Sequence, residues 1–283
     1  MRVLVTGGGG FLGSAVSRQL AAAGHEVIAF QRRPAEHLEN IGVRSIEGDI
    51  TDAEAVRAAA NSCDAIVHTA AKAGIWGDPE TFRRINVDGT TNVIAACREH
   101  GIRFLVHTSS PSVVHSGGDI ENGDESLPLA THFSAPYPET KAEAERLVAA
   151  ANEENLKTVA LRPHLIWGPG DPHILPRLVQ KSKRGSLALP APHKIIDTVF
   201  VENAALAHVL ALEELQGAAR CAGKAYFVTN HEPLPQGEVI SRLLAALGVD
   251  VKIKAVPAGV AMTAGSVLET TWKVFGLKNE PPV

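Results

Sequence analysis

A tyrosine and a lysine stand four residues apart, at Tyr137 and Lys141, in a segment that continues as the helix-forming run AEAERLVAAA. This spacing puts both side chains on one face of a helix, where they can reach the same bound molecule. A free tyrosine has a pKa of about 10, and a neighbouring ammonium group stabilises the phenolate and lowers that pKa. The pair is therefore suited to moving a proton to or from an oxygen atom at neutral pH. The alternative is a surface helix that carries these two residues by chance.

A cluster of hydroxyl side chains follows an apolar strand predicted over 103–107, at Thr108, Ser109, Ser110 and Ser112. A serine hydroxyl at a strand end can orient a carbonyl group and stabilise the charge that develops on its oxygen. On residue type alone, each of the three serines is a candidate for this role.

The chain opens with MRVLVTGGGGFLG, an apolar strand followed by glycines at three-residue spacing. Gly7 permits a tight turn, Gly10 allows a pyrophosphate to approach the backbone, and Gly13 lets the next helix pack on the strand. That helix begins at Phe11 and Leu12, and its N-terminus supplies unpaired N–H donors and a positive dipole end. The pattern predicts a dinucleotide-binding turn, and the alternative is an ordinary glycine-rich turn.

The second predicted strand, 26–30, is followed by Gln31, Arg32 and Arg33. In dinucleotide folds an acidic residue at this position accepts a hydrogen bond from the ribose 2′-OH of NAD, and no acidic residue stands here. Two arginines can instead pair with a 2′-phosphate through charge-assisted hydrogen bonds. The segment therefore predicts NADP (NADPH) in preference to NAD, with exposed loop arginines as the alternative.

Strand-like and helix-like segments alternate along the chain, which predicts an α/β fold with a Rossmann-type, doubly wound parallel sheet. We expect residues 1–170 to form the NAD(P)-binding domain. Residues 171–283 carry further helices at 175–184, 204–215 and 236–247 and strands at 195–201 and 225–229. We expect these residues to form a small α/β substrate lobe that interleaves with the first domain. A single helix is predicted over 79–99, and Asn86 within it is interpreted as a structural residue.

Composition excludes several classes of function. The net charge of −4 and the pI near 6.3 give no basic surface for nucleic acid. Three scattered cysteines are too few for a disulfide framework or a zinc site, and we expect no metal. Because the sequence opens with a predicted strand, we expect no signal peptide, and it has no apolar run of about 20 residues that could span a membrane. A cytoplasmic location is the expectation.

The glycine spacing, the serine cluster and the Tyr-x-x-x-Lys pair together resemble the extended branch of the short-chain dehydrogenase/reductase superfamily. The resemblance implies that Ser110, Tyr137 and Lys141 are catalytic, that Ser109 and Ser112 are alternatives for the serine, and that Lys141 also holds the nicotinamide ribose. It further implies cofactor contacts along the later strand ends, at Asp49, Ile50, Thr69, Ala70, Ala71, Thr108, Pro163, Leu165 and Ile166.

Within that superfamily, HTSSPSVVHSGGD, APYPETKAEAE, LRPHLIWGPGD and GKAYFVTNHEPLP resemble the 3β-hydroxysteroid dehydrogenase branch. With AAKAGIWG, they are most similar to the bacterial reductases of 2-alkyl-3-oxoalkanoates in long-chain olefin biosynthesis. This resemblance implies NADPH-dependent reduction of the 3-keto group of a lipid-like keto acid to a 3-hydroxy acid. The alternatives are an NAD(P)-dependent 3β-hydroxysteroid or sterol dehydrogenase, a nucleotide-sugar epimerase or reductase, and a non-catalytic nucleotide sensor.

Several expectations concern the substrate and partners. Substrate contacts are expected at Ile75, Trp76, Ser112 and Trp167. The apolar segment 256–277 is expected to cover the substrate cavity or to dock on a partner or membrane surface. Relatives usually run further, so we expect a C-terminal piece of the lobe to be missing. A homodimer through the two long helices is expected, together with partner proteins of an olefin pathway. Apolar positions on those helices either pair across the dimer or face their own sheet: Val93, Ile94, Leu147 and Val148.

Overall fold

The computed structural model describes residues 1–74, 76–182 and 185–257, together with residues 259, 260, 263, 265, 268, 271 and 272. The chain divides into two compact units. The first comprises Met1–Ile166 and Val199–Thr229, and the second comprises Trp167–Thr198 and Asn230–Val283. The chain first passes from one unit to the other after Ile166, close to the expected boundary at residue 170. The first unit also takes in residues 199–229, which lie beyond that boundary, because this segment returns to the main sheet.

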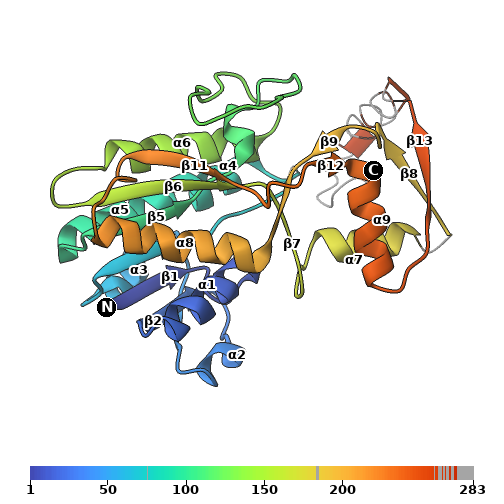
Figure 1. The fold of residues 1–283 in the computed structure, drawn as a ribbon. Helices are drawn as coiled ribbons and strands as arrows, with labels where there is room; N and C mark the ends of the chain where they lie inside the picture. Colours follow the sequence, from blue (N-terminus) through green and yellow to red (C-terminus); the bar gives the residue numbers. More distant parts are fainter. Residues whose placement is uncertain are drawn as a thin grey trace. The chain divides into compact units, whose positions relative to one another are not determined.

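A seven-stranded parallel sheet forms the centre of the first unit, which confirms the predicted fold class (Figure 1). The strand order is β11-β6-β5-β4-β1-β2-β3. Successive strands are added on one side of β1 up to β3 and on the other side from β4 onward, so the order reverses between β1 and β4. Open sheets of this kind bind ligands beyond the carboxyl ends of their strands, at the reversal point. The strands are β1 (Arg2–Thr6), β2 (Glu26–Gln31), β3 (Arg44–Glu47), β4 (Ala65–His68), β5 (Phe104–Thr108), β6 (Lys157–Pro163) and β11 (Lys224–Val228).

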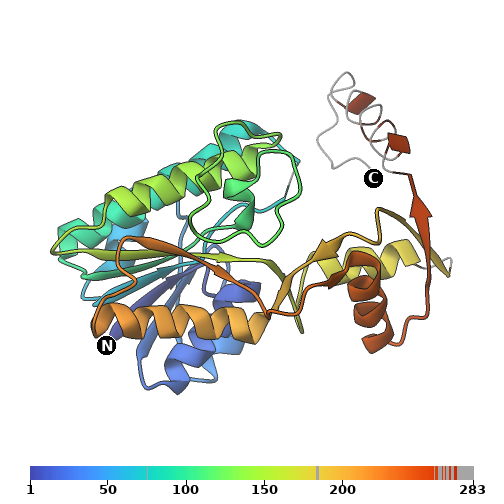
Figure 2. The same ribbon diagram turned by 45° about the horizontal axis from the view of Figure 1, so that its top comes forward.

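Helices cover both faces of this sheet (Figure 2). One face is covered by α1 (Phe11–Ala22) and α8 (Val201–Gln216), and the other by α3 (Ala53–Ala60), α5 (Gly89–His100) and α6 (Pro136–Ala150). Side chains alternate along each strand, so Val3 and Val5 of β1 lie in the α1/α8 core while Leu4 lies in the opposite core. Apolar side chains make up the two clusters, and a short helix, α2 (Glu36–Glu39), precedes β3.

The helix predicted over 79–99 is interrupted by one wider turn. It consists of α4 (Pro79–Arg83), a π-helical segment η1 (Arg84–Asp88) and α5. Such segments inside α-helices often occur at functional sites. The glycine that follows has a packing reason, because a Cβ atom at Gly89 would lie 3.0 Å from the side chain of Ile50. Asn92 of the same helix donates a hydrogen bond of 3.0 Å to the Ile50 carbonyl.

The second unit has a small core of its own. Leu187, Leu189, Ile240 and Leu244 pack between α7 (Ile174–Ser182), α9 (Gln236–Ala246) and two parallel strands, β8 (Ser186–Pro190) and β13 (Lys252–Val256). The strand predicted over 195–201 is wrong as a single element, because Asp197 separates β9 (Ile195–Ile196) from β10 (Thr198–Phe200). The first pairs with β12 (Leu234–Pro235), and the second pairs with β7 (Leu165–Trp167). The sequence analysis predicted none of β7, β8, β12 and β13.

Candidate active site

The glycine-rich turn leaves room for a phosphate group at the start of α1. Gly7 has a φ of +69°, and its carbonyl accepts a hydrogen bond of 2.8 Å from the Gly10 N–H. A Cβ atom at Gly13 would lie 2.0 Å from the Gly7 carbonyl oxygen, so only glycine fits there. No side chain caps the helix at Gly10, and its first N–H groups therefore stay available to an anion. These residues fit the pyrophosphate of a dinucleotide.

Gln31, to which the sequence patterns assigned no role, contacts this turn through its side chain. Gln31, the last residue of β2, accepts a hydrogen bond of 3.1 Å from the Gly9 N–H through Oε1. Its Nε2 donates a hydrogen bond of 2.8 Å to Ser45 Oγ on β3. Both ends of the amide are therefore engaged, and the side chain ties the glycine turn to the ends of two strands. The available signal was a polar residue at the end of an otherwise apolar strand.

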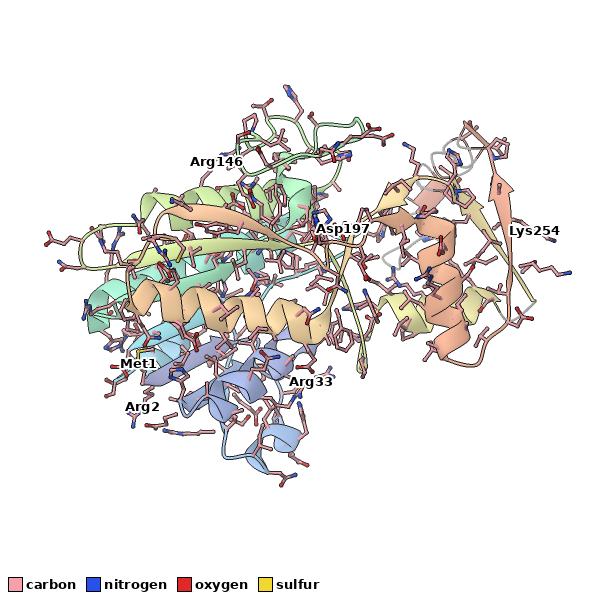
Figure 3. The ribbon with its side chains drawn as sticks, viewed as in Figure 1. Met1, Arg2, Arg33, Arg146, Asp197 and Lys254 are labelled. Atoms are coloured by element: carbon pink, nitrogen blue, oxygen red, sulfur yellow. The ribbon has the colours of Figure 1, made fainter. Side chains whose placement is uncertain are left out.

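The two candidate phosphate-binding arginines follow Gln31. Arg32 and Arg33 are both exposed, and Arg33 extends from the loop after β2 (Figure 3). Asp49, after β3, accepts hydrogen bonds of 2.9 Å from the N–H and hydroxyl of Thr51. These bonds lower the pKa of the Asp49 carboxyl group, and the positive charge of Arg32 contributes to the shift. Arg32 therefore lies near Asp49, one of the residues for which the resemblance implies a cofactor contact.

Ser110 and Tyr137 meet at the carboxyl end of β5. Ser110 precedes the 3₁₀ helix η2 (Pro111–Val114), and its hydroxyl lies 2.8 Å from that of Ser112. Tyr137 lies in the first turn of α6, close enough to Ser110 for the serine hydroxyl to counter part of the rise in the pKa of Tyr137 that burial causes. Ser109 points elsewhere, because its hydroxyl donates to the Glu145 carboxylate. Of the three candidate serines, Ser110 therefore acts on Tyr137, Ser112 is hydrogen-bonded to Ser110, and the hydroxyl of Ser109 is committed to Glu145.

Lys141 is almost fully buried, with an exposed fraction of 2%. Its ammonium group donates a hydrogen bond of 2.6 Å to the Thr108 carbonyl and lies 3.4 Å from His107 Nε2. Burial lowers the pKa of Lys141 to about 8, and the negative charge of Glu145 opposes that shift. Burial also raises the pKa of Tyr137, and the ammonium group of Lys141 does not counter this rise. The reason is that the ammonium group is directed at Thr108 and His107.

Asn86, in the π-helical segment, joins two parts of the site. Its Oδ1 accepts a hydrogen bond of 2.7 Å from the Lys72 N–H, and its Nδ2 donates to the Lys72 carbonyl at 3.1 Å and to Thr140 Oγ1 at 3.0 Å. Thr140 in turn donates to backbone carbonyls in the first turn of α6, which carries Tyr137. The amide therefore fixes the loop after β4 against the start of α6. These contacts agree with the structural role predicted for Asn86.

Three buried histidines surround the base of the site, and no sequence motif pointed to them. His68 and His107, on neighbouring strands, have ring centroids 5.2 Å apart. Thr90 donates to the Asn86 carbonyl, so its oxygen accepts from His68 Nε2, while His68 Nδ1 accepts from Thr6. Burial lowers the pKa of His68 to about 3, so the ring is neutral.

The third histidine lies on α8. His208 Nδ1 lies 2.7 Å from the Ala204 carbonyl and therefore carries the proton. Its Nε2 then accepts a hydrogen bond of 2.8 Å from the Thr108 hydroxyl. Burial lowers the pKa of His208 to about 4 and lowers that of His107 well below its usual value. Thr108, a predicted cofactor residue, is thereby fixed through both its hydroxyl and its carbonyl.

Comparison with known proteins identifies the family. Residues 4–257 match the model of the 3-beta hydroxysteroid dehydrogenase/isomerase family. The chain belongs to this family. It has the extended short-chain dehydrogenase/reductase fold, and the family consists of NAD(P)-dependent oxidoreductases.

Relatives within and beyond the family are similar over most of their length. A 2-alkyl-3-oxoalkanoate reductase of Stenotrophomonas maltophilia is 48% identical, over 100% of this chain and 87% of that protein. A decarboxylating sterol-4-alpha-carboxylate 3-dehydrogenase of Homo sapiens is 37% identical, over 90% of this chain and 69% of that protein. Among solved structures, a dTDP-glucose 4,6-dehydratase of Streptomyces venezuelae with NAD bound is similar, with a TM-score of 0.75 at 28% identity. The match covers 92% of this chain and 86% of the dehydratase chain.

The remaining cofactor residues implied by the short-chain dehydrogenase/reductase resemblance lie at several strand ends and loops. Thr69 Oγ1 donates 2.7 Å to the Thr6 carbonyl, and a Cβ atom at Gly7 would lie 2.9 Å from the Ala70 backbone, so this loop packs on the glycine turn. The other members of the set are Ile50, which is buried; Ala71, which is exposed; Pro163, which ends β6; Leu165, which is exposed; and Ile166, which packs on the α1/α8 core.

The predicted substrate residues lie in different units of this family member. Trp76 is half-buried in the first unit. Trp167 belongs to the second unit, where its Nε1 donates a hydrogen bond of 3.1 Å to Thr198. Ile75 and most of the apolar segment 256–277 lie outside the described residues. Across the part of the chain that the structure describes, no helix is long and apolar enough to cross a membrane, and no group of metal-ligating side chains gathers.

Proposed function

We propose that this protein reduces the 3-keto group of a 2-alkyl-3-oxoalkanoate to the corresponding 3-hydroxy acid with NADPH. The observation that carries the proposal is that Tyr137 lies close enough to Ser110 for that hydroxyl to counter part of the rise in its pKa, and shares α6 with Lys141, whose buried ammonium group is hydrogen-bonded to the Thr108 carbonyl. Ser110 follows β5, whose carboxyl end lies at the same edge of the parallel sheet as the glycine turn after β1, while Tyr137 and Lys141 lie on α6. The name of the Stenotrophomonas maltophilia relative supports the substrate class.

The site residues have complementary roles in this reaction. A nicotinamide cofactor supplies the hydride when bound. The Ser110 hydroxyl orients the keto oxygen and stabilises the charge that develops on it. The Tyr137 hydroxyl gives its proton to that oxygen, and burial, by raising the pKa of Tyr137, keeps the proton on the phenol until it is needed. The Lys141 ammonium adds positive charge in a site where burial strengthens electrostatic interactions.

Three features at the end of β2 support NADPH as the cofactor. Gln31 occupies the position where an acidic residue would accept from the 2′-OH of NAD, and its amide is committed to Gly9 and Ser45. A neutral amide does not repel a 2′-phosphate. Arg32, which follows it, is exposed and lies near Asp49, so it is available to pair with such a phosphate.

A sterol dehydrogenase activity is the second candidate, favoured by the relatives that act on sterols. Oxidation of a 3β-hydroxyl group uses the same three residues in the reverse direction. The two functions differ in cofactor and substrate, and the buried, protonated Tyr137 favours reduction.

The test measures cofactor preference in both directions on two substrates. The purified protein is assayed with NADPH and NADH on a 2-alkyl-3-oxo acid, and with NADP and NAD on a 3β-hydroxysterol, by following nicotinamide absorbance. We expect the largest kcat/KM for NADPH with the oxo acid. Greater efficiency on the sterol with NAD would favour the second candidate and contradict the proposal.

A further inference from the structure

A buried carboxylate stands one helical turn beyond Lys141. Glu145 has an exposed fraction of 4%, and it accepts hydrogen bonds from Arg162 Nε at 3.1 Å and Nη2 at 2.6 Å. It also accepts a hydrogen bond from the Ser109 hydroxyl. Arg162 is equally buried, and its guanidinium group lies 5.2 Å from the ring of Phe227.

These contacts connect the elements that carry the proposed catalytic residues. Ser109 directly precedes Ser110 after β5, and Arg162 directly precedes Pro163 at the end of β6. Glu145 lies on α6 with Tyr137 and Lys141. One carboxylate therefore fixes the helix that bears two of the proposed catalytic groups against the strand end that bears the third.

Stability alone does not account for this arrangement. A buried ion pair gains little over an apolar pair of similar volume, because both charges lose their hydration. The Glu145 charge does act on a neighbour in the site, since it raises the pKa of Lys141 against the lowering effect of burial. Residues four apart on a helix have Cβ atoms about 5–6 Å from each other, so the two side chains are neighbours in a buried region, where charges are screened less than at the surface.

We propose that Glu145 is a positioning residue for the proposed reaction, whose carboxylate ties Ser109 and Arg162 to α6 and balances the charge of the Lys141 ammonium. The inference deepens the proposed function and rests on its assignment of Lys141. It predicts that the negative charge at Glu145, as well as the packing of its side chain, is needed to keep Lys141 protonated near neutral pH.

Several other titratable and charged groups lie near Lys141, and a test of Glu145 must distinguish its effect on the pKa of Lys141 from theirs. On α6 these are Tyr137 and Glu145, and Arg162 of β6 lies behind Glu145. The histidines of neighbouring strands, His68 and His107, are held neutral by burial, and so is His208 of α8, which reaches the same residue, Thr108. From the outer side of α6, Arg83 of α4 pairs with Glu143 at the surface, and Asn86 of η1 is uncharged. Among these groups, only the carboxylate of Glu145 adds a buried negative charge.

The experiment measures the pKa of Lys141 directly in the protein without cofactor or substrate. Side-chain NMR signals of ¹³C-labelled lysine are followed from about pH 6 to about pH 11, and Lys141→Met identifies the signal of Lys141. In Glu145→Gln we expect the pKa of Lys141 to fall by roughly one unit, the size expected for losing one nearby charge at an effective dielectric constant of about 20.

A second variant keeps the test decisive if Glu145→Gln does not fold because it leaves Arg162 buried without its partner. Glu145→Gln combined with Arg162→Met removes both charges, and we expect a fall in the pKa of Lys141 that is smaller than in the single variant, because loss of the more distant Arg162 charge opposes part of the effect. Glu143→Gln is the matched control, since it removes a surface carboxylate from the same helix, and it should leave that pKa unchanged. An unchanged or raised pKa of Lys141 in the folded double variant would overturn the proposal.

The same variants are assayed for reduction of the oxo acid with NADPH. We expect the alkaline limb of the kcat profile to move to lower pH by the amount seen in the NMR titration. If the unaltered protein does not reduce the oxo acid, the proposed function fails, while the NMR titration still decides the role of Glu145.

Discussion

At the scale of single residues, burial decides the protonation state of the two side chains that define the site. The pKa of Tyr137 is raised and that of Lys141 is lowered to about 8, both mainly by burial. At neutral pH the phenol therefore keeps its proton, and the ammonium group keeps most of its charge. This combination suits a proton donor to a developing alkoxide beside a fixed positive charge.

Replacing the proposed proton donor tests this assignment. We expect Tyr137→Phe to lower turnover by about 10²- to 10⁴-fold, because the variant cannot supply a proton, while NADPH still binds. Turnover is measured at saturating substrate, and NADPH binding by fluorescence titration. The control is Tyr226→Phe on β11, the only other tyrosine in the sequence, which should behave like the unaltered protein. Turnover of Tyr137→Phe close to that of the control would refute the assignment.

Cofactor choice depends on the first arginine after β2. We expect Arg32→Ala to weaken NADPH binding by about 1–3 kcal/mol and to leave NADH binding nearly unchanged, because only NADPH carries the 2′-phosphate. Dissociation constants for both cofactors give the comparison, with Arg33→Ala as the neighbouring variant. An equal loss for NADPH and NADH in Arg32→Ala would show that Arg32 does not read the phosphate.

At the scale of elements, neutral histidines join β4, β5 and α8 beneath the site. Protonating them would place uncompensated charge in a fully buried region. Their folded pKa values lie below the unfolded value of about 6.5, so the unfolded chain takes up more protons as the pH falls. Stability contributed by the neutral rings is present above about pH 6.5 and is lost below it.

Acid sensitivity is the resulting prediction. Between about pH 6 and pH 4, these three histidines should make the free energy of unfolding fall by up to about 4 kcal/mol per pH unit. His208→Gln, which can keep both hydrogen bonds without titrating, should reduce that slope by about 1.4 kcal/mol per pH unit. Urea unfolding at a series of pH values measures both slopes. The control is His132→Gln at the surface, and an unchanged slope in His208→Gln would contradict the interpretation.

Sequence patterns predicted the elements with strong local signals. The apolar strands of the main sheet and the glycine turn follow from residues that are adjacent in the chain, as does the face shared by Tyr137 and Lys141. The π-helical turn at Asn86 could not be predicted, because it depends on Lys72 and Thr140, which are far from it in sequence. The same is true of Gln31, whose role depends on a loop of another element, and of Glu145, whose partners come from two strands. The short strands of the second unit lack the length for a clear alternation of apolar residues.

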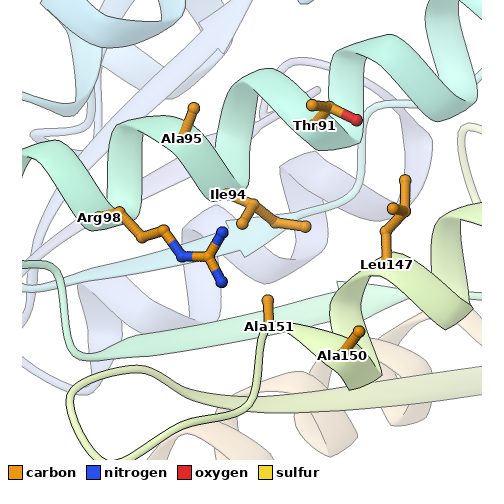
Figure 4. A pocket seen from close by; sticks show the side chains of 7 residues that line it. All are labelled: Thr91, Ile94, Ala95, Arg98, Leu147, Ala150 and Ala151. Carbon is orange, nitrogen blue, oxygen red and sulfur yellow. The ribbon is translucent and has the colours of Figure 1, made fainter.

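At the scale of the whole molecule, α5 and α6 lie side by side in the first unit. Val93, Ile94 and Val148 are buried in the protein's own core, as one of the two sequence interpretations had it. The residues that remain on the outer side are mostly small or apolar. A pocket of about 230 Å³ lies among them (Figure 4), lined by Thr91, Ile94, Ala95, Arg98, Leu147, Ala150 and Ala151.

We propose that a second copy of the chain packs on this surface of α5 and α6. Light scattering at micromolar concentration should then give twice the chain mass of 29.9 kDa. Ala95→Glu, which puts a charge on the outer side of α5, should yield a monomer that keeps its fold. A monomeric unaltered protein, or a dimer unaffected by this substitution, would contradict the proposal.

We propose that this member of the 3β-hydroxysteroid dehydrogenase family reduces a 2-alkyl-3-oxo acid with NADPH. The most direct measurement uses NADPH that carries deuterium at its transferable position, with mass spectrometry of the acid that is formed. We predict a 3-hydroxy acid with one deuterium on the former keto carbon. Recovery of unreduced oxo acid, or of hydroxy acid without deuterium, would contradict the claim.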